Sequence, residues 1–391
     1  MRILIVNGHL HIGGVEKSLV NLLKAFDYSQ HQVDLLLVED LGEYRDEIPP
    51  QVRVLYYDMK PTYGSVRSVL AGAVSDKDYK LAWRKTVITA GNKIGKRCLR
   101  GLDLPKELAQ AYDCAIAYRV GMPLDLVSYV IKAKVKCVWW HHGEFDYPES
   151  VVKNWRDACK HVDRIICVSE ASRKMIEPHF PGFEKKMCVV PNMIIPEEIQ
   201  RAAETFDPYQ GQEGKTILVS VGRMSAEKHM IDTVDVMDTL IKRGHKNLLW
   251  YLVGDGVERK IIEKRIREFG LEQYFCLVGN QANPYPYINY ADLYVHPSWV
   301  ESQGICVLEA MALKKKSVVV YSEGTDEFIE DGVNAIQAAR SIQDLSDKIG
   351  SVLMCDTEMN LKTGQEKTVN VYSPTAVMPM FLKAISDTTI E

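Results

Sequence analysis

Long apolar runs, an excess of positive charge and closely spaced cysteine pairs are all missing from the sequence. A membrane-spanning helix needs about 18–20 consecutive apolar residues, and no stretch of the chain approaches that length. The formal net charge of −4 argues against a dedicated nucleic-acid-binding protein. The nine cysteines include no Cys-x-x-Cys pair. We therefore interpret them as small buried residues of a cytoplasmic protein and expect no metal site.

The fingerprint of dinucleotide-binding oxidoreductases is missing as well. An apolar run at 2–7 is typical of a buried parallel strand. Residues 18–26 then repeat apolar side chains at the spacing of one helix face, and another apolar run follows. This is the strand–helix–strand order of a nucleotide-type βαβ unit. Its turn glycines, Gly8, Gly13 and Gly14, do not form Gly-x-Gly-x-x-Gly, which counts against a nicotinamide-dependent enzyme.

Two successive series of strand-like runs indicate two domains. With 391 residues, 46% of them hydrophobic and 26% charged, the chain is long enough to bury two cores. The first series ends near residue 190, and the second begins at residue 216. The intervening residues 195–214 are acidic, contain prolines and glycines and have no strand-like run, so we expect a linker there. The sequence therefore predicts two α/β domains.

The stretch 301–312 combines two carboxylates with the start of a helix. Pro297 ends the preceding apolar run, and Gly304 comes before a run of good helix formers. With Glu301 on the loop and Glu309 in the first turns, both side chains can face the crevice where open α/β sheets bind ligands. Amides at the helix N-terminus favour an anion such as a diphosphate there. The alternative is a solvated loop glutamate and an ordinary first-turn glutamate.

Two basic residues follow the first strand of the second series. The run 216–221 ends in Gly222-Arg223, and Lys228 stands five residues further on at a predicted helix start. The two cations can converge on one anion, with Arg223 binding as a fork and Lys228 as a point charge. The alternative is a pair of solvated surface cations.

A pair of histidines ends another strand-like run. Residues 136–140 lead into His141, His142 and Gly143. A strand that delivers an imidazole onto a glycine turn is well placed for an active site. The alternative is that the imidazole only caps the neighbouring backbone.

Together these motifs resemble the GT-B glycosyltransferases, in particular the large retaining family 4. Glu301 and Glu309 match the family's Glu-x7-Glu signature, and Gly222-Arg223 with Lys228 match its diphosphate clamp. The turn Gly13-Gly14-Val-Glu resembles the family's Gly-Gly-x-Glu. His142 before Gly143 matches its His-Gly form better than His141 does. The resemblance runs from residue 1 to about 385, is strongest at 216–334 and is weak at 41–110.

The resemblance implies a GT-B fold, with two Rossmann-like, doubly wound parallel-sheet domains that face a cleft. It implies an acceptor-side domain at 1–200, a nucleotide-sugar-binding domain at 201–371 and a C-terminal helix at 372–391 that crosses back. The implied activity is transfer, with retention, of a hexose-type sugar from a nucleotide-diphosphate donor to a glycan or lipid-linked acceptor. Such reactions build bacterial envelope polysaccharides and glycolipids.

Two other functions were weighed against this activity. A catalytically silent GT-B scaffold, or a nucleotide-sugar-binding subunit of a glycan assembly complex, would share the fold. A glycosidase needs an acid and a second carboxylate that flank the scissile bond. It would have no use for Arg223 and Lys228, so we favour the transferase.

The resemblance also assigns roles to individual positions. It implies catalytic roles for Arg223, Lys228, Glu301 and His142, and donor contacts at Gly13, Gly14, Gly222, Gln303, Gly304, Ile305 and Glu309. The two cations would hold the diphosphate, Glu309 the ribose hydroxyls and Glu301 a hydroxyl of the donor sugar. Relatives often carry an aromatic residue at the place of Gln303, so its amide is predicted to help select the sugar. No metal and no cofactor besides the donor nucleotide sugar are expected.

Residues 76–100 are basic although the whole chain is net acidic. The stretch contains eight lysines and arginines, two aspartates and several interleaved apolar residues. This mixture is typical of an interfacial amphipathic helix. We therefore expect Lys77–Arg100 to rest on an anionic membrane at its cytoplasmic face. The alternative is a solvated lysine-rich helix with a buried apolar face, and Gly91 and Gly95 weaken any continuous helix.

Overall fold

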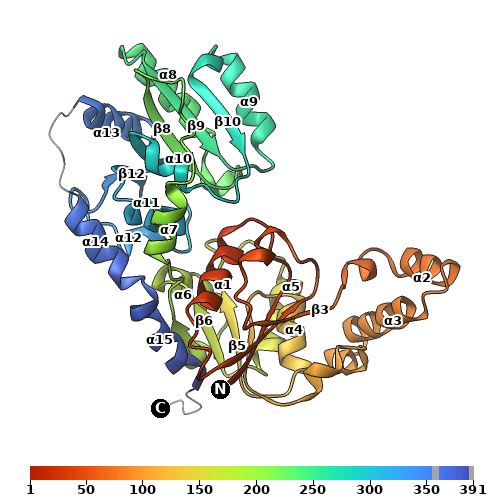
Figure 1. Ribbon diagram of the computed structural model, residues 1–391. Helices are drawn as coiled ribbons and strands as arrows, with labels where there is room; N and C mark the ends of the chain where they lie inside the picture. Colours follow the sequence, from red (N-terminus) through yellow and green to blue (C-terminus); the bar gives the residue numbers. More distant parts are fainter. Residues whose placement is uncertain (355–360, 387–391) are drawn as a thin grey trace.

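The structure is a computed structural model that describes residues 1–354 and 361–386. Within these residues, two parallel β-sheets form the centres of two domains (Figure 1). The strands of the first sheet are β1 (Arg2–Asn7), β2 (Gln32–Leu37), β3 (Arg53–Tyr56), β4 (Tyr112–Ala117), β5 (Ala133–Trp140), β6 (Arg164–Cys167) and β7 (Met187–Val189). Those of the second are β8 (Thr216–Val221), β9 (Leu248–Val253), β10 (Phe275–Gly279), β11 (Leu293–His296), β12 (Ser317–Val320) and β13 (Ile336–Ala338).

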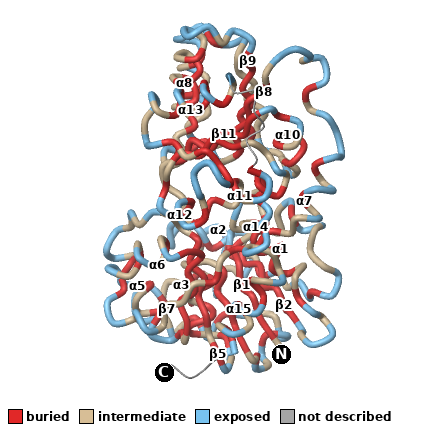
Figure 2. The backbone as a smooth tube through the Cα atoms, turned by 90° about the vertical axis from the view of Figure 1, so that its left-hand side faces the viewer, coloured by how far each residue is buried: buried red, intermediate tan, exposed pale blue. Residues whose placement is uncertain are grey.

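Both sheets have the strand order of doubly wound folds. The first runs β3-β2-β1-β4-β5-β6-β7 and the second β10-β9-β8-β11-β12-β13. In each sheet the chain starts near the middle and the order reverses there, between β1 and β4 and between β8 and β11. Helices cover both faces, so the central strands are apolar on both sides. Figure 2 shows these buried strands as red segments in both domains. The predicted strands at 2–7 and 216–221 are confirmed.

The helices of each domain divide between the two faces of its sheet. On the first sheet, α1 (Gly14–Lys24) and α15 (Pro374–Ser386) pack on one face. The other face is covered by α4 (Met122–Tyr129), α5 (Glu149–Cys159) and α6 (Glu170–Ile176), and α3 (Tyr79–Lys93) reaches the same core through Val87. On the second sheet, one face carries α7 (Pro196–Ala203), α10 (Tyr285–Tyr290), α11 (Ile305–Ala312) and α14 (Lys362–Val371). The opposite face carries α8 (Asp232–Lys242), α9 (Arg259–Glu268) and α13 (Ile342–Met354).

The chain changes from one hydrophobic core to the other earlier than predicted. Met193 packs in a core of the first sheet, whereas Ile194 packs in a core of the second. The predicted boundary between residues 200 and 201 falls inside α7, whose Ile199 and Ala203 pack against the second sheet. The expected linker at 195–214 therefore begins with a helix, because its apolar residues repeat at helical spacing.

The C-terminal helix crosses back onto the first domain. The ring of Phe381 on α15 stacks on Trp139 of β5 at 5.6 Å and meets Phe26 edge to face at 5.7 Å. Val377 and Ile385 are fully buried in the same core. This confirms the predicted crossing helix within 374–386, while the remainder of the predicted segment, 387–391, lies outside the described residues. The GT-B fold is confirmed.

A helical hairpin stands out from the side of the first domain. It consists of α2 (Val66–Ser75) and α3 (Figure 1), and its turn includes Asp78, whose carboxylate accepts from the amide of Leu81. The predicted basic helix at 76–100 is not continuous, because α3 ends at Lys93 and a separate 3₁₀-helix, η3 (Lys96–Gly101), follows. Gly95 between them has φ of +155°, a conformation that suits glycine. We call residues 63–101 the arm.

Candidate active site

The loop after β11 delivers Glu301, and α11 carries Glu309. Gly304 has φ of +81° directly before α11, and a Cβ at this position would stand 2.6 Å from the side chain of Thr325. Only glycine meets both conditions. The helix begins at Ile305, slightly before its predicted start, so Glu309 lies in its second turn. Local sequence therefore places both carboxylates, one on the loop and one on the helix.

Glu301 is the centre of a buried charge network. Its Oε1 accepts from Lys228 Nζ at 2.7 Å and lies 2.9 Å from His296 Nε2. The other ring nitrogen of His296 is 3.1 Å from the Tyr294 hydroxyl. A neutral imidazole satisfies every contact, with the Tyr294 hydroxyl donating to Nδ1 and Nε2–H donating to the carboxylate. Burial alone would raise the pKa of Glu301, but Lys228 and His296 outweigh it and hold the pKa well below its usual value.

The two predicted cations are placed differently. Lys228 ends the 3₁₀-helix η7 (Ala226–Lys228) and is already paired with Glu301. Arg223, on the turn after β8, is exposed, and no carboxylate pairs with its guanidinium among the residues that the structure describes. The described chain therefore offers one guanidinium without an ion-pair partner and one lysine whose charge is shared with a carboxylate.

Glu309 lies in a less polar environment than Glu301. The carboxylate is 5% exposed and accepts from the Tyr285 hydroxyl at 2.8 Å. Burial raises the pKa of Glu309 to about 7, against the opposing effects of Tyr285, Lys17 and Cys306. The two glutamates of the motif therefore have pKa values displaced in opposite directions, because only Glu301 has a cation in hydrogen-bond contact.

The structure distinguishes the two adjacent histidines of the first domain. His141 is buried, and its ring packs against Tyr118 at 4.6 Å and Trp139 at 5.6 Å. His142 lies where the positive charges of Arg119 and Arg223 both act on it. Burial and these two charges lower the pKa of His142 to about 4, so its imidazole is neutral near pH 7. Of the two histidines, it is therefore His142 whose pKa is lowered by the charge of Arg223.

The Gln303 side chain is hydrogen-bonded to the first domain. Its side chain is 2% exposed, and its Oε1 accepts from both the backbone and the side-chain nitrogen of Asn192, at 2.8 and 2.9 Å. Its Nε2 donates to the Asn192 carbonyl at 2.9 Å. Asn192 therefore occupies three of the four hydrogen-bonding positions of this amide across the domain interface, and selection of the donor sugar by Gln303 stays a prediction.

Turns of the first domain surround the loop that carries Glu301. Besides Asn192, the hydroxyl of Ser169 donates to the carbonyl of Ser302. Gly143 is so close that a Cβ on it would stand 2.7 Å from the amide nitrogen of Ser302. These turns of the first domain therefore fix the loop of the second domain.

Two family models match consecutive parts of the chain. The model described as Glycosyltransferase Family 4 matches residues 12–198, and the one described as Glycosyl transferases group 1 matches 202–368. The two matches cover the two domains that the cores define. The chain therefore belongs to the glycosyltransferases of the group 1 and Family 4 type.

Relatives of the family share parts of the sequence and the whole fold. Alpha-D-kanosaminyltransferase of Streptomyces kanamyceticus is 31% identical over 35% of this chain and 35% of its own. Alpha-monoglucosyldiacylglycerol synthase of Acholeplasma laidlawii is 26% identical over 42% of each. The chain thus spans less than half the length of either relative. Anabaena HepE, solved in complex with UDP-glucose, has a TM-score of 0.74 over 99% of both chains at 18% identity, a likeness that shows the fold.

The glycine turn of this family member supports a polar cluster in the first domain. Gly13 precedes α1, and a Cβ on it would stand 2.6 Å from a carboxylate oxygen of Glu16. Glu16 is buried and lies 3.2 Å from the guanidinium of Arg119, whose Nη1 is 3.1 Å from a ring nitrogen of His9. A Cβ on Gly14 would meet no atom within 4 Å, so of the two glycines only Gly13 is required by close contact.

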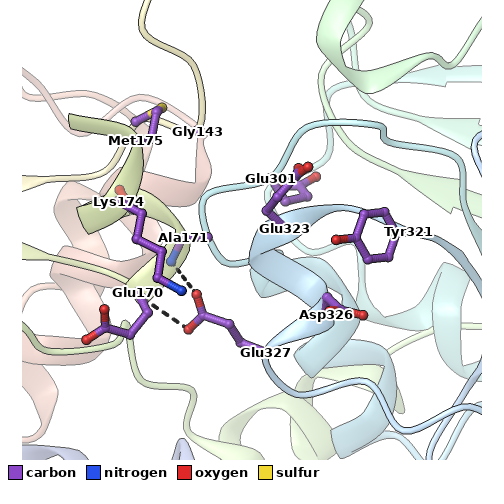
Figure 3. Close-up of a pocket in the computed structure, with 11 residues that line it drawn as sticks. Gly143, Glu170, Ala171, Lys174, Met175, Glu301, Tyr321, Glu323, Asp326 and Glu327 are labelled. Carbon is purple, nitrogen blue, oxygen red and sulfur yellow. Dashed lines mark hydrogen bonds between the residues drawn. The ribbon is translucent and has the colours of Figure 1, made fainter. Parts of the chain in front are cut away.

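A cavity of about 490 Å³ adjoins the Glu301 loop between the domains. Figure 3 shows α6 on one side and the short helix α12 (Glu323–Asp326) on the other. Glu327 accepts from the amides of Glu170 and Ala171 at 3.1 and 2.5 Å, which links the domains at this cavity. The cavity lining includes both Gly143 and Glu301.

Metal ligands do not gather at this site. In the described part of the chain, no group of three or more histidine, cysteine or acidic side chains is arranged to hold a metal ion. The Asp-x-Asp pair of the sequence, Asp76 and Asp78, lies in the turn of the arm, far along the chain from the motif glutamates. Likewise, no helix in 1–354 or 361–386 is long and apolar enough to cross a membrane.

Two residues of this site were not predicted from the sequence: His296 and Arg119. His296 stands directly before Pro297 at the end of a strand-like run, which is a signal that could have indicated it. Arg119 likewise follows the strand-like run at 113–118. Nothing in the local sequence indicates that Tyr285 would reach Glu309.

Proposed function

We propose that the protein is an active glycosyltransferase that moves a hexose-type sugar from a nucleoside-diphosphate donor to an acceptor hydroxyl, with retention at the anomeric carbon. Two features together carry this proposal: the Arg223 guanidinium is free of ion pairs in the described chain, and the Glu301 carboxylate is held ionised. Arg223 has no partner in the described chain, while Lys228 and His296 keep Glu301 ionised.

In the proposed reaction, Arg223 and Lys228 hold the diphosphate and stabilise the negative charge that develops when the sugar leaves. Glu301 accepts a hydrogen bond from a hydroxyl of the donor sugar, and Glu309 accepts hydrogen bonds from the ribose hydroxyls. The turn at Gly222 and the amides of 303–305 add contacts to phosphate and sugar. These are the donor roles that the resemblance implied, except that the Gln303 side chain is committed to Asn192.

The bond changes need no covalent intermediate on the protein. The bond between the anomeric carbon and the phosphate oxygen breaks, and the acceptor oxygen bonds to the same carbon on the same face. The acceptor proton passes to the leaving diphosphate. His142, neutral near pH 7, accepts or donates a hydrogen bond beside the transferred sugar without adding charge.

We further propose that the first domain binds the acceptor and the second binds the nucleotide sugar. The acceptor is a glycan or a lipid-linked molecule of the envelope, a class that fits the name of the monoglucosyldiacylglycerol synthase relative. A silent scaffold has no need for a buried ion pair or for an unpaired guanidinium. The presence of both therefore favours an active enzyme.

A panel of nucleotide sugars tests the proposed function. UDP-, GDP-, ADP- and TDP-linked hexoses are mixed with the protein, and thermal stabilisation and slow donor hydrolysis are measured for each. At a donor concentration of 100 times Kd, the free energy of unfolding should rise by about 2.7 kcal/mol. At least one donor should raise the Tm and release its nucleoside diphosphate. Stabilisation without hydrolysis or transfer would favour the silent subunit, and no response to any donor would contradict both.

We also propose that the arm rests on an anionic membrane surface. Its large apolar side chains are unusually exposed, with Trp83 at 53%, Tyr79 at 75% and Ile94 at 83%. Half of the predicted cations serve the fold instead: Arg84 pairs with Asp103, Lys96 pairs with Asp125, Lys85 donates to two backbone carbonyls and Arg100 to a third. The exposed cations without such a partner are Lys77, Lys80, Lys93 and Arg97.

Vesicle binding should therefore depend on these four cations. Each contributes about 1 kcal/mol near an anionic surface, so the unchanged protein should sediment with phosphatidylglycerol vesicles at low salt and less at high salt. Reversing Lys77, Lys80, Lys93 and Arg97 to glutamate should abolish sedimentation. The matched control reverses Lys185, Lys246, Lys260 and Arg267, exposed residues elsewhere, and should bind normally. An equal loss of vesicle binding in both variants would show that net charge alone matters and would contradict the proposed role of the arm.

A further inference from the structure

A lysine of the first domain reaches a tyrosine of the second. Lys17 lies in the first turn of α1, and its Nζ is 2.9 Å from Glu47 Oε2. The same ammonium lies 5.4 Å from the ring centre of Tyr44, in the 3₁₀-helix η1 (Glu43–Glu47), and 5.9 Å from that of Tyr285 on α10. Its side chain is 14% exposed. Lys17 therefore occupies a nearly closed position between the two domains.

Tyr285 connects this lysine to the motif carboxylate. The Tyr285 hydroxyl donates to Glu309 at 2.8 Å. In the part of the chain that the structure describes, no cation is within salt-bridge distance of Glu309. A buried carboxylate without a paired cation is costly, and such a group tends to take up a proton. Lys17 is the positive charge that acts on Glu309.

We propose that Lys17 is a positioning residue for the nucleotide: it keeps Glu309 a carboxylate, the form that accepts two ribose hydroxyls. The inference rests on the proposed function, because it concerns the same nucleotide site. A protonated Glu309 carries a hydrogen on one oxygen and accepts less well. Since Lys17 and Glu309 belong to different domains, the nucleotide site is complete only while the domains are in contact. Separation of the domains favours proton uptake and release of the nucleotide.

Glu309 is the group near this site whose charge changes close to neutral pH. The titratable groups that face it are Lys17 on α1, Tyr44 on η1, Tyr285 on α10, Tyr294 on β11 and Cys306 on its own helix. Burial raises the pKa of each of the three tyrosines and of Cys306 far above 7. Glu47, which binds Lys17, also faces Lys24.

Lys24 provides a matched control. It lies on the same helix, and its Nζ bonds the same Glu47 oxygen at 3.0 Å. It also reaches the second domain, through Glu198 at 2.6 Å. Lys24 has no contact with Tyr285 or Glu309 in the described chain. A Lys24→Met variant therefore loses a cation from Glu47 and a link between the domains, but leaves Glu309 untouched.

The experiment measures the affinity of the full chain for UDP by calorimetry between pH 6 and 9, with GDP and ADP as further probes. Removing a nearby opposite charge shifts the pKa of a carboxylate by about one unit or more. With a starting pKa of about 7 for Glu309, Lys17→Met should weaken binding about fivefold at pH 7 and leave it within about twofold at pH 9. Lys17→Arg should restore the affinity, and Lys24→Met should match the unchanged chain throughout.

Inorganic pyrophosphate separates the two ways in which a lysine could act. It has no ribose, so Lys17→Met should not change its binding at any pH. A loss shared by pyrophosphate and UDP, or one that persists at pH 9, would show direct contact with phosphate and overturn the inference. So would equal affinities of the Lys17→Met and Lys24→Met variants at pH 7. If the unchanged chain binds no nucleoside diphosphate at any pH, the proposed function itself fails and the inference falls with it.

Discussion

Replacing Arg223 with alanine is expected to lower kcat by about two to three orders of magnitude. Removing a preorganised charged group that stabilises a developing anion typically costs about 3–4 kcal/mol of transition-state stabilisation. The exposed guanidinium makes no ion pair in the described chain, so its loss should not disturb the fold. Arg223→Lys keeps the charge but loses the fork geometry, so its kcat should lie between those of the unchanged protein and of Arg223→Ala.

Turnover of the best donor in the panel, with thermal unfolding measured alongside, checks this expectation. Arg267→Ala removes an exposed arginine from α9 on the other face of the second sheet and should leave kcat unchanged. The Tm of both variants should equal that of the unchanged protein. A kcat for Arg223→Ala within a few-fold of normal would exclude the diphosphate role.

Glu301→Gln is expected to lower kcat by about two orders of magnitude and also to destabilise the protein. One buried oxygen of Glu301 lies 2.7 Å from Lys228 Nζ and 2.9 Å from His296 Nε2. The amide leaves Lys228 without a counter-charge, and breaking a buried charge-assisted contact costs about 2–4 kcal/mol. Unlike Arg223→Ala, this variant should therefore lose both activity and stability.

A surface ion pair near the same cavity supplies the control. Glu323 binds Arg340, but its side chain is 59% exposed, so Glu323→Gln should cost less than about 1 kcal/mol. Urea unfolding at pH 7 measures the free energy of unfolding of both variants. If Glu301→Gln is as stable as Glu323→Gln, the buried network does not contribute to folding.

The stability lost in Glu301→Gln should also depend on pH. The pKa of Glu301 in the folded protein lies below the 4.5 of an ordinary glutamate, so ionised Glu301 stabilises the fold at pH values above 4.5. That contribution disappears as the pH falls through the folded pKa. The difference in free energy of unfolding between the two proteins should therefore be full at pH 6 and shrink as the pH falls below 4.5. A difference that does not change with pH would mean that packing, and not charge, is lost.

Local sequence patterns were sufficient for the family and for part of the secondary structure. The strand at 2–7, the glycine before α11 and the spacing of Arg223 and Lys228 each follow from interactions within a few residues. Apolar runs predict strands buried on both faces, and a glycine with positive φ marks a helix start. The basic stretch at 76–100 was recognised too, and the predicted weakness at Gly95 is where α3 and η3 separate.

Other features follow from side chains that meet across long stretches of sequence. Gln303 bonds Asn192, 111 residues away, and Glu301 bonds Lys228, 73 residues away. The motif shows that these residues are polar, but not that they satisfy one another. An amide such as that of Gln303 bonds to whichever partner the packing of the domains provides.

The sequence by itself determined two α/β domains, their order and the chemical types of residue at the carboxyl ends of the strands. These depend on hydrophobic period, turn glycines and motif spacing, which are properties of neighbouring residues. The tertiary structure decided which histidine faces Arg223, where the chain changes core and which carboxylate keeps its charge. Each of these depends on burial and on the distance to charges from another element, because desolvation and Coulomb interactions act through space and not along the chain.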